Sequence, residues 1–143
     1  MSSIGDCSKG PHGSIRDWDV SGVTKMGELF SHASTFNQDL SKWDVSAVTD
    51  MASMFSYAST FNQDLSKWDV SAVTSMTFMF SGAPAFKREL CGISWVKSKA
   101  KKRNMFMESP GSISSTVCAT ARTGYGEGEG HGNLGCGLVV CVC

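Results

Sequence analysis

Apolar residues recur along this chain in a fixed order, and one part of that order has the spacing of a helix. From Met51 to Ala58 they stand at positions i, i+3, i+4 and i+7, which places them on one helical face. The same spacing runs from Met26 to Ala33 and from Met76 to Ala83. The pattern predicts three helices of two turns or fewer, with N-caps at Thr24, Thr49 and Thr74. Helices this short are unstable alone, so we expect neighbouring segments to hold them.

The segments between these predicted helices are typical of brief strands. Asp39–Trp43 and Asp64–Trp68 are each bounded by polar residues, and we expect them to lie about 4.8 Å apart in a parallel stack. The next segment, Asp44–Val48, is predicted to turn, because aspartate and serine side chains bond to the backbone two residues on.

This order of elements repeats every 25 residues. The segment FNQDLSKWDVSAVT, which begins at Phe36, returns unchanged at Phe61, and the 25-residue copies that begin at these two residues agree at nineteen positions. Such a period is the mark of a solenoid, in which each unit buries its apolar face only against its neighbours. The predicted core consists of the columns of equivalent residues: Ile15, Leu40, Leu65 and Leu90; Trp18, Trp43 and Trp68; Val20, Val45 and Val70; Val23, Val48 and Val73; Met26, Met51 and Met76; Phe30, Phe55 and Phe80; Phe36, Phe61 and Phe86.

The pattern divides the chain into three regions. Residues 1–13 are polar and contain glycine and proline, so we expect a flexible lead-in. Residues 14–118 form the predicted repeat domain, and from about residue 86 they lose the pattern and gain charge, as a capping coil would; Ser98–Met107 is the predicted last helix. Residues 119–143 carry glycine at alternate positions and then the run LGCGLVVCVC, for which we expect a disordered tail.

Charge and hydropathy narrow the range of partners. Thirteen basic residues balance thirteen acidic residues, so no net charge draws the chain to nucleic acid. No stretch approaches the roughly 20 apolar residues that a membrane span needs, and the first ten residues lack the apolar region of a secretory signal. The five positive charges between Lys97 and Arg103 are interpreted as a solvated face of the last helix, with binding of phosphate or an acidic polymer as the alternative.

Columns of polar residues are the candidates for bound ions. Asp19, Asp44 and Asp69 occupy equivalent positions, and carboxylates about 5 Å apart repel one another unless they are paired. One interpretation is that each aspartate caps its own turn; the other is a ladder of calcium ions that bridges the repeats. Identical amides at Asn37 and Asn62, with glutamines beside them, predict a hydrogen-bonded ladder along the stack.

Six cysteines are present, and sequence alone does not choose among their pairings. Cys91 and Cys118 bracket the predicted capping segment and are the candidates for a disulfide in an oxidising compartment. Their bridge would close a loop of about 27 residues and stabilise the fold by roughly 3 kcal/mol. The cysteines of the tail, with His131, lack zinc-finger spacing.

The unit from Met51 to Met76, Met-x-x-Met-Phe-x-x-Ala-x-x-Phe-Asn-Gln-Asp-Leu-x-x-Trp-Asp-Val-Ser-x-Val-Thr-x-Met, resembles the repeat of the BspA-like leucine-rich-repeat surface proteins. Its motif Trp-Asp-Val-Ser-x-Val-Thr-x-Met occurs three times in register, and the resemblance covers Ile15 to about Cys118. It implies an α/β solenoid, a leucine-rich-repeat-like right-handed coil of about four turns with short parallel strands and short helices. It also implies adhesion or protein binding, at the cell surface or in secreted form, with no catalytic residues to transfer.

We therefore expect a non-catalytic repeat scaffold of the surface-protein or adhesin type, which binds a protein or glycan partner and needs no cofactor. No nucleophile–base arrangement or phosphate-binding glycine loop indicates an enzyme. Positions that vary between otherwise identical repeats are the natural determinants of specificity, and we expect them on the helix side. They are Lys25, Glu28, His32, Asp50, Ser53, Tyr57, Ser75 and Phe78.

Two alternatives to this hypothesis remain open. The first is a truncated structural fragment of a longer repeat array, without a partner of its own. The second is a calcium-binding scaffold that uses the columns of aspartates at Asp19, Asp44 and Asp69.

Overall fold

Regular secondary structure is sparse in the computed structural model, which describes residues 11–119. It consists of the 3-10 turn η2 (Ile15–Asp17), strand β1 (Glu89–Leu90), helix α1 (Ile93–Val96) and strand β2 (Ser112–Ile113). The predicted α/β solenoid of about four coils, built from parallel strands and short helices, is therefore wrong as a fold class. No helix or named strand lies between residues 18 and 88.

Pairs of four-residue turns stand where the three helices were predicted. The N–H of Leu29 donates to the Met26 carbonyl at 3.3 Å, and the N–H of Ala33 donates to the Phe30 carbonyl at 3.1 Å. The third residue of each turn, Glu28 or His32, has a φ of 59°, which is the left-handed region used by type II turns. Equivalent turns follow one and two repeats later. A positive φ at every fourth residue is incompatible with an α-helix, so the threonines do not cap helices.

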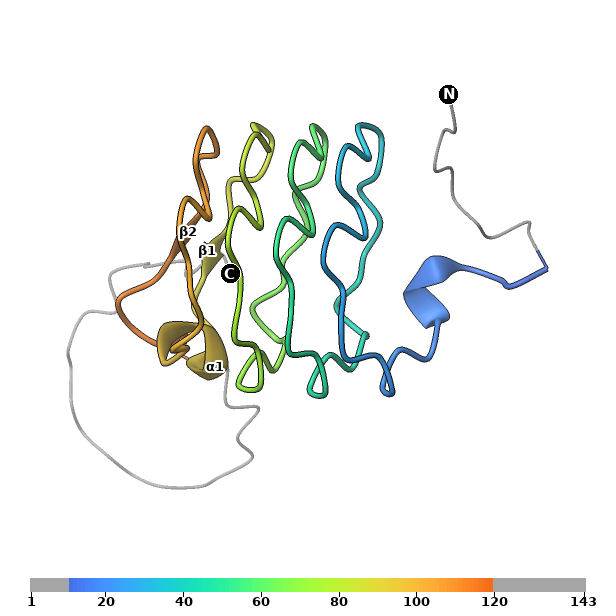
Figure 1. The fold of residues 1–143 in the computed structure, drawn as a ribbon, viewed down its shortest axis with the longest axis horizontal. Helices are drawn as coiled ribbons and strands as arrows, with labels where there is room; N and C mark the ends of the chain where they lie inside the picture. Colours follow the sequence, from blue (N-terminus) through green and yellow to red (C-terminus); the bar gives the residue numbers. More distant parts are fainter. Residues whose placement is uncertain (1–10, 120–143) are drawn as a thin grey trace, which may run out of the picture.

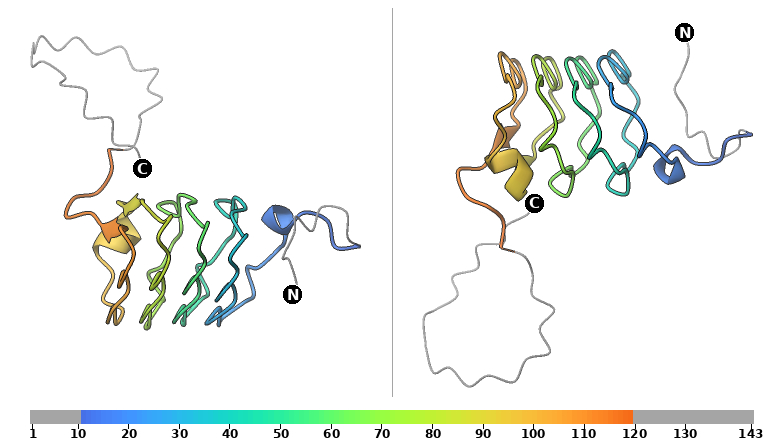
Figure 2. Two further views of the ribbon diagram at one scale, coloured as in Figure 1. Left: turned by 90° about the horizontal axis from the view of Figure 1, so that it is seen from above. Right: turned by 60° about the horizontal axis from the view of Figure 1, so that its bottom comes forward.

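Hydrogen bonds between repeats take the place of helical bonds. The N–H groups of Met26, Glu28 and Phe30 donate to the carbonyls of Asp50, Ala52 and Met54 at 2.8–2.9 Å, and His32 continues the series to Ser56 at 2.8 Å. The next two junctions repeat this arrangement. Figure 1 shows the resulting loops side by side along the long axis, and both views in Figure 2 agree. Each short turn pair is thus held by its neighbours in addition to the bonds that close its own turns.

The predicted strands Asp39–Trp43 and Asp64–Trp68 are also turns. Asp64 Oδ1 accepts the N–H of Ser66 at 2.9 Å, and the N–H of Trp68 donates to the Leu65 carbonyl at 3.0 Å. The indole then reaches back across the stack, where Trp68 Nε1 donates to the Leu40 carbonyl at 2.9 Å. Trp43 and Trp95 make the same type of bond to Ile15 and Leu65. Side chains therefore supply the cross-links that strand pairing would have supplied.

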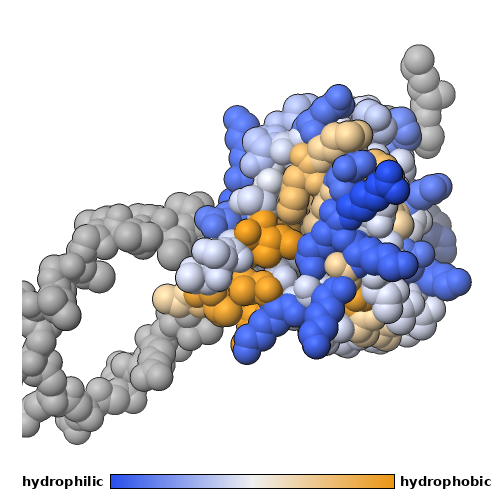
Figure 3. Space-filling model, turned by 60° about the vertical axis from the view of Figure 1, so that its left-hand side comes forward, coloured by the Kyte–Doolittle hydropathy of each residue, from blue (hydrophilic) through white to orange (hydrophobic). Residues whose placement is uncertain are grey.

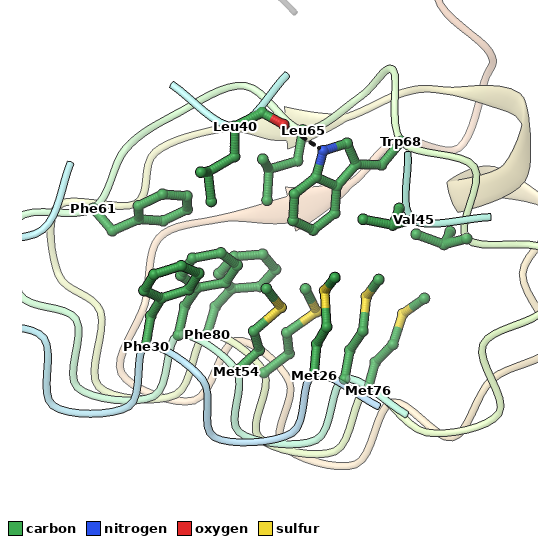
Figure 4. Packing of buried hydrophobic residues seen from close by; sticks show 14 of the residues in the cluster. Met26, Phe30, Leu40, Val45, Met54, Phe61, Leu65, Trp68, Met76 and Phe80 are labelled. Atoms are coloured by element: carbon green, nitrogen blue, oxygen red, sulfur yellow. Dashed lines mark hydrogen bonds between the residues drawn. The ribbon is translucent and has the colours of Figure 1, made fainter. Parts of the chain in front are cut away.

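The core consists of the predicted columns. Figure 4 shows phenylalanine rings in one row and methionines in the next, with Trp68 opposite them. The rings of Phe30, Phe55 and Phe80 lie parallel, with centroids 5.4–5.5 Å apart. Two members of the columns lie outside the core: Trp18 is 39% exposed and Val23 is 36% exposed, because nothing precedes them in the described stack. Burial of a large apolar side chain contributes about 2–3 kcal/mol, so these columns are the main stabilising feature.

The C-terminal end of the described chain departs from the repeat. β1 pairs with β2 in parallel, and α1 contains the buried Trp95. The predicted helix Ser98–Met107 is wrong, because a turn pair occupies residues 102–109, with positive φ at Asn104 and Glu108. Lys102 stands where Met76 stands one repeat earlier, and its ammonium donates to the Ser98 carbonyl at 2.6 Å. Burial lowers the pKa of Lys102.

The ends of the sequence fall largely outside this description. The predicted flexible lead-in (1–13) and disordered tail (119–143) lie beyond the described residues, apart from 11–13 and 119. Among residues 11–119, no helix has the length and apolar character needed to cross a bilayer.

Candidate functional site

The variable residues gather on one edge of the stack, the turn ridge, which comprises the turn pairs of residues 25–33, 50–58, 75–83 and 101–109 (Figure 1, top of the view). Glu28, Ser53 and Phe78 are the third residues of successive first turns, with φ of 59°, 55° and 57°. His32 and Tyr57 are the third residues of the second turns, with φ of 59° and 57°. These five candidates therefore share one unusual backbone conformation rather than the face of a helix.

The other three candidate residues directly precede the turn pairs. Lys25, Asp50 and Ser75 form a series of isolated parallel bridges that continues to Lys101. Asp50 Oδ1 also accepts the N–H of Ala52 at 2.9 Å. This row holds the loops in register, and only Lys25 and Lys101 are exposed in it.

The turn ridge carries an aromatic pair, and the sequence pattern did not reveal this pair. The rings of His32 and Tyr57 stack with centroids 4.9 Å apart and an interplanar angle of 14°. The Tyr57 ring continues over Gly82, where an added Cβ would lie 2.5 Å from Tyr57 Cδ1. Tyr57 stays 46% exposed. The signal in the sequence was the series of His, Tyr and Gly at a spacing of 25 residues, in which the glycine leaves room for the ring.

The aspartates of the candidate calcium ladder each bind their own turn. Asp44 Oδ1 accepts the hydroxyl of Ser46 at 2.6 Å and its N–H at 3.0 Å. These bonds hold the pKa of Asp44 below its ordinary value. Asp19 and Asp69 accept the N–H of Ser21 and Ser71 in the same way, and serine hydrogen bonds lower their pKa values. No group of three or more His, Cys, Asp or Glu side chains suited to a metal occurs among residues 11–119. The calcium ladder stays a prediction.

The side-chain amides of asparagine and glutamine and the hydroxyls of threonine form hydrogen bonds between repeats. Asn37 Oδ1 accepts the N–H of Asn62 at 2.9 Å, and Asn62 Oδ1 accepts the N–H of Lys87 at 3.0 Å. Gln63 adds a bond from Nε2 to Asn37 Oδ1 at 3.0 Å. Likewise the hydroxyl of Thr49 donates to the Thr24 carbonyl at 3.1 Å. The amide ladder thus runs mainly from side chain to backbone.

A groove of about 960 Å³ opens at the C-terminal end of the described stack. Ile93 of α1, Val117 and Trp68 line it together with Lys67 and Lys97. Figure 3 shows apolar side chains gathered at this end, with charged side chains beside them. Sequence reasoning missed this groove, because its walls come from segments that are separate in the sequence. The basic run from Lys97 to Arg103 lies on loops and turns rather than on a helix.

A disulfide joins Cys91 and Cys118, whose Cα atoms are 5.0 Å apart. The N–H of Cys118 also donates to the Cys91 carbonyl at 2.9 Å. The bridge ties the segment after β2 to the segment after β1. Disulfides persist in oxidising compartments and are rare in the cytosol.

Comparison with known proteins identifies a family without a known activity. Residues 1–117 match the family described as Mycoplasma protein of unknown function, DUF285. The chain belongs to the DUF285 family. The match begins at the first residue and ends just before Cys118, so it includes the whole turn ridge. No curated protein and no solved structure matches this chain.

Proposed function

We propose that this DUF285 protein is a non-catalytic repeat scaffold that binds a protein or glycan partner through the turn ridge. The observation that carries the proposal is the conformation of the variable residues. Glu28, His32, Ser53, Tyr57 and Phe78 all occupy left-handed turn positions along one edge. The backbone there is fixed by bonds between repeats, while the side chains differ. Constant geometry with variable exposed side chains is typical of recognition surfaces.

The aromatic content of the ridge supports recognition rather than simple solvation. Tyr57 is 46% exposed, and His32 stacks on it. Phe78 is half-buried beside two positions that carry Glu and Ser. Tyrosine and other aromatic residues are enriched at binding hot spots, because they offer a large contact area with few rotatable bonds.

The disulfide supports an extracellular setting for this scaffold. A bridge between Cys91 and Cys118 is expected in an oxidising compartment. The resemblance to the BspA-like surface proteins favours the same setting, and with it a role in adhesion.

The test uses the full-length chain, oxidised, on a printed array of glycans and on an array of folded extracellular proteins. A ridge variant carries Glu28→Ala, His32→Ala, Tyr57→Ala and Phe78→Ala. A matched control carries Lys42→Ala, Lys67→Ala and Lys87→Ala, which are exposed and lie off the ridge. We expect an array component whose binding the ridge variant loses by about tenfold or more, as loss of one hot spot would cause, while the control retains it. Absence of binding to either array, or equal binding by both variants, would contradict the proposal.

A further inference from the structure

The groove at the C-terminal end of the described stack has the size and the walls of a ligand site. Its volume of about 960 Å³ lies within the range of pockets that hold small molecules or short peptide segments. Two apolar side chains that line it face solvent, since Ile93 is 58% exposed and Val117 is 44% exposed. Figure 3 shows the apolar patch at this end. The described lining includes no residue of the turn ridge, so the groove is a second surface, separate from the function proposed above.

The two apolar walls are held close to each other. A disulfide joins Cys91 to Cys118, and Val117 directly precedes the second cysteine. Gly92 lets the chain that enters α1 pack on the Ser66 carbonyl, because a Cβ at residue 92 would overlap that oxygen. A site whose walls are fixed before binding loses less conformational entropy when a ligand is bound. The groove is therefore preformed.

The groove presents two lysines that make no ion pair within the described chain. Lys67 and Lys97 line it and are exposed, and among residues 11–119 no carboxylate pairs with either. Lys42, which precedes Lys67 by one repeat, does pair with Asp17, at 3.8 Å. Lys67 has a lysine rather than an aspartate one repeat before it, so the column gives it no such carboxylate.

The two aspartates of the groove are already engaged in their own turns. Asp64 Oδ1 accepts the N–H of Ser66 at 2.9 Å, and Asp69 Oδ1 accepts the N–H of Ser71 at 3.0 Å. The surrounding chain is basic, since residues 87–119 contain seven basic and two acidic residues. The groove therefore favours an anionic ligand over a cationic one.

We propose that this groove binds an extended acidic segment of a partner protein. An apolar side chain of the segment would lie between Ile93 and Val117, and its carboxylates would pair with Lys67 and Lys97. The apolar walls favour a peptide over a glycan, because Ile93 and Val117 offer a sugar neither a hydrogen bond nor an aromatic ring. The concave shape favours a single segment over a flat membrane surface.

Fluorescence polarisation of three labelled octapeptide pools tests this specificity on the oxidised full-length chain. The first pool combines Asp and Glu with Leu, Ile and Phe at random positions. The second pool has Lys and Arg in place of the acids, and the third has Ser in place of the apolar residues. We expect the first pool to bind at least about tenfold more tightly than either of the others, since only this pool offers both kinds of contact. Equal binding of the three pools, or binding of none, would overturn the proposal.

Charge reversal tests the lysines. Lys67→Glu with Lys97→Glu should weaken binding of the first pool by about tenfold or more, because it places carboxylates opposite the acids of the peptide. The matched control, Lys99→Glu with Lys101→Glu, makes the same change in net charge at two exposed lysines outside the groove lining. Salt at about 0.15 M screens attraction beyond direct contact, so the control should lose less than about threefold.

A change from an apolar to an acidic side chain tests the walls. Ile93→Asp should weaken binding by about tenfold or more, because it removes apolar contact and repels the peptide. Val23→Asp is the matched control: Val23 is 36% exposed, lies outside both the groove and the turn ridge, and should leave binding unchanged. Circular dichroism of each variant confirms that it is folded.

Three further outcomes decide the assignment. Equal losses within either matched pair would overturn the proposal, because binding would then follow net charge or general stability. Tighter binding of heparin, or of vesicles of phosphatidylserine and phosphatidylcholine in equal parts, that Lys67→Glu with Lys97→Glu removes would also overturn it, in favour of an acidic glycan or a membrane. The variant of the turn ridge should retain peptide binding, and loss of binding there would contradict a separate site.

Discussion

Trp68 donates its indole N–H to the carbonyl of Leu40, which lies in the previous repeat, at 2.9 Å (Figure 4). Trp68 is 2% exposed and Leu40 is fully buried. Trp43 and Trp95 repeat the relationship. Each indole thus joins one repeat to the next where no strand ladder exists, and it adds a second donor to a carbonyl that already accepts a backbone N–H, as Leu40 accepts that of Trp43 at 3.0 Å.

The Trp68→Phe variant keeps an aromatic ring but removes this donor. We expect the free energy of unfolding to fall by about 2–3 kcal/mol, from the lost hydrogen bond between repeats and the smaller ring. Denaturant titration of the oxidised protein measures it. Trp18→Phe is the control: its indole bonds to the His12 carbonyl at an exposed site, so the loss should be under about 1 kcal/mol. Equal losses in the two variants would show that the buried bond has no special role.

Gly82→Ala should destabilise the protein for two separable reasons. The new Cβ would lie 2.5 Å from Tyr57 Cδ1, and the φ of +66° is costly for alanine. We expect a loss of about 1–3 kcal/mol in thermal or denaturant unfolding. Gly22→Ala, where nothing lies within 4 Å, should change stability by less than about 0.5 kcal/mol.

A double variant separates the clash from the backbone strain. Tyr57→Ala with Gly82→Ala removes the ring but keeps the unfavourable φ, so part of the loss should be recovered relative to the sum of the single variants. If the two single losses simply add, the Tyr57 ring does not rest on Gly82.

The turn aspartates should make stability depend on pH. Hydrogen bonds from serine lower the pKa values of Asp19, Asp44 and Asp69 below the ordinary value of 3.8. A carboxylate whose pKa is depressed by folding contributes stability above the unfolded pKa, and loses it as the pH falls through the folded pKa. We expect the unfolding midpoint to be level above about pH 5 and to fall below pH 3.8.

The triple variant Asp19→Asn, Asp44→Asn and Asp69→Asn tests this assignment. Asparagine Oδ1 can still accept the serine N–H but does not titrate in this range. The fall in midpoint between about pH 4 and pH 2 should therefore be shallower than in the parent protein. An unchanged pH profile would assign the acid dependence to other carboxylates.

Removal of the disulfide should loosen the C-terminal end of the repeat domain. Cys91→Ser with Cys118→Ser opens a loop whose ends are 27 residues apart in sequence. We expect the free energy of unfolding to fall by about 3 kcal/mol, measured by denaturant titration. Reduction of the parent protein should give the same result, and Cys7→Ser should leave this difference between oxidised and reduced forms intact. Unfolding that is insensitive to reduction would contradict the stabilising role.

Several features of the fold were predictable because they depend on the repeat alone. The 25-residue period gave the buried columns of Met26, Phe30 and Phe36, since equivalent positions in stacked units share one environment. The turn at Asp44 could be predicted from local chemistry, because the Asp44 side chain accepts its hydrogen bond from Ser46, only two residues on. The variable residues of the turn ridge could be identified as a set, because variation between copies is visible in the sequence.

The prediction of helices was wrong because two backbone conformations fit the same hydrophobic pattern. Apolar residues at i, i+3, i+4 and i+7 fit a helical face, but they also fit two consecutive four-residue turns whose first and last residues point inward, as from Met51 to Ala58. The choice depends on where the N–H groups of residues such as Ser53 and Tyr57 find acceptors. Those acceptors, the carbonyls of Thr77 and Ser81, lie in the next repeat.

The sequence by itself therefore determined the period, the residues that are buried and the positions that vary, since these are properties of equivalent residues. Only the tertiary structure decided the backbone conformation of each repeat. Four bonds to a neighbouring loop outweigh the few that a two-turn helix could make within itself. The same bonds place Glu28, Tyr57 and Phe78 at left-handed turn positions along one edge. The groove, too, belongs to the tertiary structure, because its walls at Ile93 and Val117 come from segments that are separate in the sequence.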